Sequence, residues 1–342
     1  MLEEDKYTEF CLMFRLLHAS RFQAKGDEPC VMERWFNMSI ESGNRIRNGL
    51  SLAVQKTMET IGNAVLTSEG KGNEALRNAF TEGTMDADKL NKELIHFIYR
   101  LLFLFIIEER GLVYQIPDSP DAPDYKQLCA WQDIYKKFYA ASRLRHLSEL
   151  AYLKQRQYFD LWQGLMDTFH LFEPDTFGER LGINPLGGVL FGRETLHWLK
   201  QCQVSNLDVL TAFSALNEFT DERQQRVKIN YSSLDVEEFG SVYEGILEMR
   251  PFVQPGVSAA DWQFGFVGGL DRQSTSSYYT RPDLVQNLIQ TTLEPVIKEK
   301  ISHLSSTEEK VKALLNMKVC DAASGSGHIV LAMARTIAWY IC

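Results

Sequence analysis

Residues 318–328 read Lys-Val-Cys-Asp-Ala-Ala-Ser-Gly-Ser-Gly-His, and this stretch decides the fold. A short apolar run predicts a strand, and Gly325 and Gly327 predict a turn. Beyond the turn, apolar residues recur at the three- and four-residue spacing of a helix; they are Val330, Met333, Ala334, Ile337, Ala338 and Ile341. A strand, a glycine turn and a helix form the opening unit of a nucleotide-type binding fold.

The bulk composition is that of an ordinary globular protein of about two domains. The chain has 342 residues, of which 45% are hydrophobic and 24% charged. Its net charge of −9 argues against a general basic coat for nucleic acid and leaves a local basic groove open.

Neither a metal site nor a membrane span is predicted. The six cysteines are scattered without a CxxC pair, which disfavours zinc and fits a reducing cytoplasm. No signal peptide is evident at the N-terminus. The most apolar run, residues 101–107, is much shorter than the ~20 residues of a membrane span, so it predicts a buried core helix and no membrane partner.

The first two-thirds of the chain predict helices. Apolar periodicity marks helices over residues 10–17, 46–66, 90–112 and within 131–172, with Gly111 as the stop of the third. A hairpin is predicted around Trp262 and Phe264. Thr280 can cap a further helix that continues to Ile297 with a kink at Pro295.

A basic stretch is interleaved with the aromatic residues of 131–172; it comprises Lys136, Lys137, Arg143, Arg145, Lys154 and Arg156. One interpretation is a DNA-backbone contact surface, because phosphate binding needs clustered cations. The other is a solvated helix face around an aromatic core, and we favour this one because helices commonly carry such charge.

Four segments together resemble adenine-specific DNA methyltransferases of the fused type IIG restriction–modification and phage-defence kind. D-A-A-S-G-S-G-H at 321–328 resembles their D-P-A-C-G-S-G-H turn, and S-S-Y-Y-T-R-P-D-L-V at 276–285 resembles the segment before it. F-G-S-V-Y-E-G-I-L-E at 239–248 and Y-R-L-L-F-L-F-I-I-E-E-R-G-L at 99–112 resemble two upstream helices. Ala322 and Ser324 depart from the usual proline and cysteine, while both glycines and the acid are kept.

The resemblance implies S-adenosylmethionine as cofactor and double-stranded DNA as partner. It implies a cofactor site formed by Tyr279, Thr280, Asp321, Ala322, Gly325, Ser326 and Gly327. Glycines let the backbone approach a ligand, and the helix start at His328 offers free N–H groups to a carboxylate. We expect His328 itself to be a plain first-turn residue.

No catalytic residue is predicted in this chain. The family's N-P-P-Y or D-P-P-Y tetrapeptide, which hydrogen-bonds the amine of the extruded adenine, is absent. Asn184-Pro185-Leu186-Gly187 shares two of its letters but lies before the glycine turn, and we interpret it as a loop. We therefore expect a fragment of the enzyme that binds S-adenosylmethionine weakly or not at all.

The predicted fold class is a mainly α region followed by the first β-α unit of a Rossmann-like methyltransferase domain. The expected divisions are a helical connector over 1–228, a helical segment with the Tyr-Tyr-Thr motif over 229–315, and the strand, turn and helix over 316–342. Two other hypotheses stay open: a helical DNA-binding or assembly subunit completed by a second chain, and methylation of a different substrate.

Overall fold

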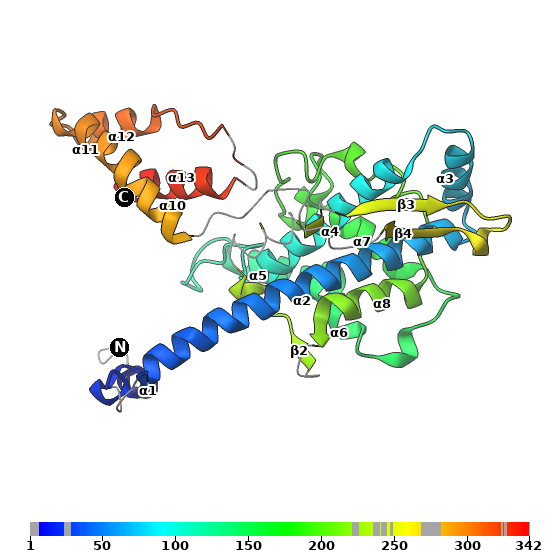
Figure 1. Ribbon diagram of the computed structural model, residues 1–342, viewed down its shortest axis with the longest axis horizontal. Helices are drawn as coiled ribbons and strands as arrows, with labels where there is room; N and C mark the ends of the chain where they lie inside the picture. Colours follow the sequence, from blue (N-terminus) through cyan, green and yellow to red (C-terminus); the bar gives the residue numbers. More distant parts are fainter. Residues whose placement is uncertain are drawn as a thin grey trace.

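The chain folds mainly as α-helices, which make up about 63% of the computed structural model. The structure describes residues 7–23, 29–220, 226–234, 240, 245–246, 249–267, 282–322, 324 and 327–341. In this part of the chain the strands form only two small antiparallel pairs (Figure 1). The mainly α prediction is confirmed, and a Rossmann-like unit remains a prediction.

Three long helices form the centre of the first unit. They are α2 (Val31–Thr67), α4 (Ala87–Glu109) and α8 (Asn206–Asn217), and α8 packs along the second half of α2. Each has a side-chain cap; in α4, for example, Asp86 accepts a hydrogen bond from the Lys89 amide at 2.8 Å. The run 101–107 lies inside α4 and is largely buried, as predicted. Gly111 ends this helix with a left-handed φ of 66°.

Shorter helices and turns complete the first unit. They are α1 (Tyr7–Leu17), η1 (Ala19–Arg21), α3 (Lys71–Thr81), α5 (Tyr125–Ile134), η2 (Tyr135–Tyr139), α6 (Ala141–Leu147), η3 (Ala151–Leu153), α7 (Asp160–His170), η4 (Gly178–Leu181), η5 (Arg193–Leu196), η6 (Tyr231–Ser233) and η7 (Ala259–Asp261). The α elements among them are short α-helices, and the η elements are 3₁₀ turns except η2, which is a π-helical turn. The predicted helical region 131–172 is thus divided among five elements: α5, η2, α6, η3 and α7.

The predicted hairpin is confirmed and lies against α2. Strand β3 (Arg250–Gln254) pairs with β4 (Gln263–Val267), with Val253 opposite Phe264; β1 (Glu218–Thr220) pairs with β2 (Arg226–Lys228). The Asn63 amide donates to the Phe264 carbonyl and accepts from the Phe264 N–H, both at 2.9 Å. This side chain therefore pairs with the β4 backbone where no further strand does.

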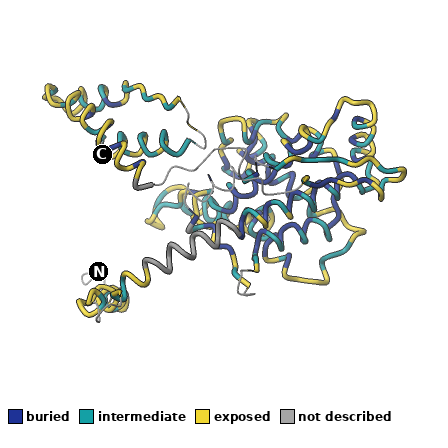
Figure 2. The backbone as a smooth tube through the Cα atoms, in the orientation of Figure 1, coloured by how far each residue is buried: buried dark blue, intermediate teal, exposed yellow. Residues whose placement is uncertain are grey.

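One continuous core holds this unit together, shown dark blue in Figure 2. Its largest buried side chains include Trp162, Phe97, Phe105 and Phe213. Six buried residues that follow α8 in the chain belong to the same core as α2, α4 and α8: Ile229, Tyr231, Leu234, Ile246, Trp262 and Phe264. The domain boundary expected between residues 228 and 229 stays a prediction.

A second, smaller core joins the helices near the C-terminus. These are α10 (Pro282–Leu288), the π-helical turn η8 (Ile289–Leu293), α11 (Glu294–Ser302), α12 (Thr307–Leu315) and α13 (His328–Ile341). Val285, Ile289 and Ile297 are buried against Ile329 and Met333 of α13. The kink predicted at Pro295 takes the form of η8, because proline cannot donate the next helical hydrogen bond and its ring crowds the carbonyl four residues earlier.

The strand predicted at 318–321 has no pairing partner in the described chain. Exposure nevertheless alternates from Met317 to Ala322, with Met317, Val319 and Asp321 the less exposed residues. The segment is therefore extended, and it lacks the neighbouring strand whose hydrogen bonds would define a ladder. Among the described helices none combines the length and apolar character needed to cross a membrane.

Candidate functional site

The predicted cofactor turn leads directly into α13. Gly327 has a φ of 78°, a left-handed conformation that L side chains rarely adopt. Its amide donates to the Ser324 carbonyl at 2.6 Å, and its own carbonyl accepts from Leu331 at 3.0 Å. A Cβ at Gly327 would meet nothing within 4 Å. Backbone conformation, and not crowding by the protein, therefore requires glycine here, and the space beside its Cα is open.

Asp321 and Ala322 immediately precede this turn. Asp321 is partly exposed at the end of the extended segment, and Ala322 is exposed. Of the other predicted site residues, Tyr279, Thr280, Gly325 and Ser326 lie outside the described residues. The structure thus describes Asp321, Ala322 and Gly327 in one loop, and the remaining four stay predictions.

The helices that follow the two predicted cofactor-binding segments belong to one packed unit. Helix α10 begins directly after the Tyr-Tyr-Thr segment, and α13 begins directly after the glycine turn. Both helices contribute to the second core, where Val285 and Ile289 are buried together with Ile329 and Met333 of α13. The first amides of α13 have no partner within the helix and carry the positive end of its dipole. An anionic group could bind there.

Glu108, in the predicted Glu-Glu-Arg helix end, is a buried joint between α4 and α6. Its carboxylate accepts from the Tyr135 hydroxyl at 2.6 Å, from the Ala141 amide at 2.8 Å and from the Ser142 amide at 2.7 Å. Burial raises the pKa of this carboxyl, and the Tyr135 hydrogen bond opposes the shift. Glu108 therefore caps the start of α6 from a helix distant in sequence.

Glu109 and Arg110 hold a different segment of the chain. Glu109 pairs with Arg145 and accepts from the Ser232 amide at 3.0 Å. Arg110 donates to the carbonyls of Ser232 and Leu234 at 3.1 and 2.7 Å. These three consecutive charged residues join α4 to α6 and to residues 232–234. We interpret their role as structural, since the hydrogen bonds and the ion pair described here are made to other groups of the same chain.

A cavity of about 160 Å³ lies beside Glu108. Tyr114, Tyr135 and Lys136 line it together with Ser142. The Tyr135 hydroxyl is engaged by Glu108, and the Lys136 ammonium by Gln132 at 2.9 Å. The polar groups of this wall are thus largely committed to one another, and the cavity does not resemble a prepared catalytic site.

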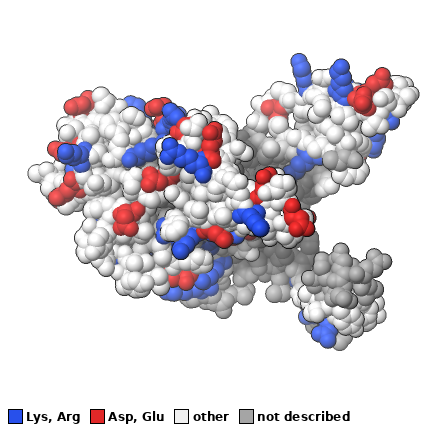
Figure 3. All heavy atoms as spheres, turned by 180° about the vertical axis from the view of Figure 1, so that it is seen from behind, with Lys and Arg blue, Asp and Glu red and all other residues white. Residues whose placement is uncertain are grey.

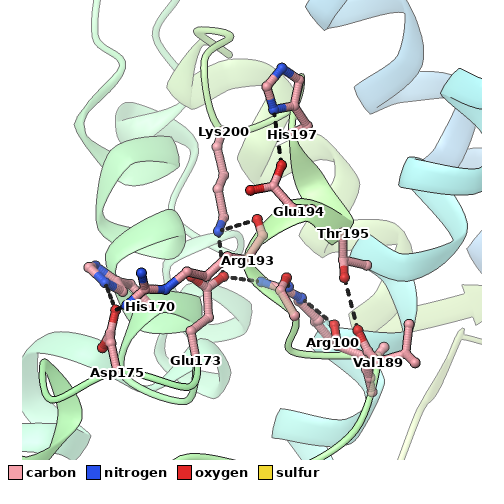
Figure 4. Close-up of polar contacts among 12 residues, drawn as sticks. Arg100, His170, Glu173, Asp175, Val189, Arg193, Glu194, Thr195, His197 and Lys200 are labelled. Carbon is pink, nitrogen blue, oxygen red and sulfur yellow. Dashed lines mark hydrogen bonds and ion pairs between the residues drawn. The ribbon is translucent and has the colours of Figure 1, made fainter.

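A second polar cluster centres on Arg100, shown in Figure 4. Its guanidinium is fully buried and donates to Glu173 and to the carbonyls of Leu190 and Gly192, each at 2.8 Å. Lys200 reaches the same Glu173 oxygen. The cluster fastens the loop 173–200 to α4. This role of Arg100 was not predicted from the sequence. The one available signal was a charged residue at a position where the apolar periodicity of 90–112 predicts a buried side chain.

Asp175 organises the outer edge of this cluster (Figure 4). It lies 2.6 Å from His170 Nε2 and 3.0 Å from Arg193, and it accepts from the Phe177 amide at 2.9 Å. The hydrogen bond from the Phe177 amide lowers the pKa of Asp175 most, and the His170 and Arg193 side chains lower it further. No nucleophile accompanies the His170–Asp175 pair in these contacts, so the pair stabilises the turn after α7.

The basic stretch 136–156 does not form a single surface. Arg145 is buried and ion-paired, Arg143 is partly buried, and only Lys136, Lys137 and Arg156 are fully on the outside. On the face drawn in Figure 3, cations and anions are interspersed. A contact surface made of all six cations is therefore wrong, and the favoured interpretation as a solvated face holds only for part of the set.

No metal centre is found in the described residues, where no three His, Cys, Asp or Glu side chains are grouped to hold an ion. The comparisons with protein-family models, curated proteins and solved structures found no match to this chain.

Proposed function

We propose that this chain contributes a helical connector and the first cofactor-binding unit of an adenine-specific DNA methyltransferase. The reaction transfers a methyl group from S-adenosylmethionine to the exocyclic amine of adenine. The observation that carries the proposal is the left-handed Gly327 immediately before α13, in a helical unit that also contains the helix following Tyr279 and Thr280. This pairing of segments is what the four-segment resemblance implies.

The chemistry of S-adenosylmethionine fits this turn. Its methionine carboxylate suits the positive dipole end of α13, and the open space beside Gly327 allows a ligand to approach the backbone. Asp321 supplies an anionic group near the turn that suits the ammonium of the same ligand. In this scheme the residues bind and orient the cofactor, and the group that holds adenine comes from elsewhere.

The outward face of α13 also supports the proposal. Leu331 and Trp339 are exposed there, while Ile329, Met333 and Ile337 pack on the second core. A helix that is apolar on both sides is usually covered on both sides. The parallel sheet of a Rossmann-like domain would cover this outer face.

One observation favours the alternative of an assembly subunit completed by a second chain. Helix α1 exposes Leu12, Phe14 and Leu17 near the start of α2. Such apolar side chains suit a protein partner. The two proposals differ in one measurable respect: the group that holds adenine is carried by the same polypeptide in the first and by a separate polypeptide in the second.

Adenine methylation in the strain that encodes the chain tests the proposal. Gly327→Ala should reduce N6-methyladenine at one defined DNA sequence, because alanine resists the φ of 78°. Gly83→Ala is the matched control: Gly83 has a φ of 75° and equally open surroundings, but lies in the turn after α3. If deletion of the gene leaves every N6-methyladenine site unchanged, the proposed function is wrong.

A further inference from the structure

The connection between α6 and α7, residues 149–160, presents aromatic side chains to solvent. Tyr152 is 69% exposed, Tyr158 52% and Phe159 36%. Three large aromatic side chains on one short surface segment are unusual, because such side chains ordinarily contribute to a core. Much of each ring is therefore accessible to a binding partner.

The backbone of this connection is held in place. The Tyr158 carbonyl accepts from the Asn206 amide at 2.7 Å, and the Gln155 carbonyl accepts from the Leu207 amide at 3.1 Å. Both bonds tie the segment to the start of α8. Binding through Tyr152 and Tyr158 would therefore order few further backbone groups, which keeps the entropic cost of association low.

Residues 149–160 carry two cations, Lys154 and Arg156, and two anions, Glu149 and Asp160, so their formal charges cancel, and the cation available to a phosphate is Arg156. Arg156 is exposed and forms no ion pair with any part of the chain that the structure describes, and Lys154 donates only to the Ser214 hydroxyl at 3.0 Å. Of the two acids, Glu149 is paired with Lys228 at 2.8 Å. Asp160 accepts from the Asn206 amide group at 2.9 Å and is the one carboxylate without an ion pair here.

We propose that residues 149–160 bind an unpaired stretch of a DNA strand, with bases stacked on Tyr152 and Tyr158 and a phosphate held by Arg156. Aromatic rings beside cations are the combination that binds single strands, because every base has a π-face and every linkage a negative charge. In a duplex the bases are already stacked on one another, so the tyrosine rings have no base to receive. The choice of DNA over RNA rests on the proposed function.

Fluorescence anisotropy with a labelled oligothymidylate of ~16 nucleotides tests the surface, without S-adenosylmethionine. Tyr152→Ala and Tyr158→Ala should each raise the Kd roughly 5- to 150-fold and leave its salt dependence unchanged. Arg156→Ala should also weaken binding, and should reduce the slope of log K against log salt by about 0.7, as expected for one lost phosphate contact. A merely structural role for these side chains would not separate the two readouts.

Tyr7→Ala is the matched control, since Tyr7 is 67% exposed on α1 but lies outside the connection. It should leave the Kd unchanged. The proposal is overturned if the three variants bind like the wild type, if a duplex of equal length binds as tightly as the single strand, or if the chain binds neither. If the three variants bind the oligonucleotide like the wild type while the gene is still required for adenine methylation, this surface is refuted and the proposed function stands. If the variants weaken binding but deletion of the gene leaves adenine methylation unchanged, the proposed function is refuted and the surface stands as a binding site for single strands.

Discussion

Replacing Glu108 by alanine should destabilise the first unit by about 3–5 kcal/mol. The carboxylate receives three hydrogen bonds from groups that pack between α4 and α6: the Tyr135 hydroxyl and the amides of Ala141 and Ser142. A buried donor left without an acceptor costs about 1–3 kcal/mol, and loss of a helix cap alone costs about 1 kcal/mol. Three such donors would cost roughly 3–9 kcal/mol, and the low end of that range applies because the neighbouring cavity of about 160 Å³ can admit water to some of these donors.

Urea unfolding followed by circular dichroism would measure this loss, with Glu194→Ala as the control. Glu194 is almost fully exposed, and its one ion pair, to His197, lies at the surface. We expect the control to change the free energy of unfolding by less than ~0.5 kcal/mol. A loss below ~1 kcal/mol for Glu108→Ala would refute the capping role assigned to Glu108.

The same carboxyl predicts a pH dependence with a definite sign. Burial raises its pKa in the folded protein above the ordinary value of 4.5. The folded state therefore binds the proton more tightly than the unfolded state, so this group lowers stability as pH rises from about 4.5 through the raised pKa. Glu108→Gln removes that contribution. The stability advantage of the wild type over Glu108→Gln should accordingly narrow with rising pH, and an advantage that widens would contradict the assignment.

Four further substitutions test other parts of the fold. Arg100→Met should cost about 3–5 kcal/mol in urea unfolding because it leaves Glu173 buried with only Lys200 to neutralise it, and the double variant with Glu173→Gln should recover part of that loss. Asn63→Leu should speed hydrogen exchange at the Phe264 amide, since that N–H loses its only partner outside β3; unchanged exchange would show that α2 does not hold the hairpin. Gly83→Ala and Gly327→Ala should each lower the free energy of unfolding by about 1–2 kcal/mol, because alanine is strained at a left-handed φ. The loss should appear as a lower melting temperature.

Helix positions in the first unit follow closely from the sequence. Periodicity of apolar residues placed α4 and the second half of α2, and Gly111 marked the end of α4 because only glycine readily adopts its φ of 66°. The hairpin around Phe264 was also predictable, from glycine and aromatic residues. The start of α2 at Val31 was not predicted, and apolar periodicity indicated this helix only from Ile46 onward.

Contacts between segments distant in the chain could not be predicted from the sequence. Glu108 and Arg145 appeared as charges at the end of one helix and within a basic stretch, and nothing local shows that they face different partners. Their partners are at least 27 residues away along the chain, so tertiary folding alone decides whether a charge is solvated or buried. For the same reason the six cations of 136–156 divided into buried and exposed members.

The candidate cofactor turn shows a different limit. Gly327 is predictable as a turn residue from two glycines, and the structure gives it a left-handed φ. The strand predicted before it depends on hydrogen bonds to a neighbouring strand, and local sequence contributes only the alternation of Met317 and Val319 toward the second core. Under the proposed function, a parallel strand placed beside residues 318–321 would complete the ladder and so create the sheet edge at which we propose that S-adenosylmethionine binds.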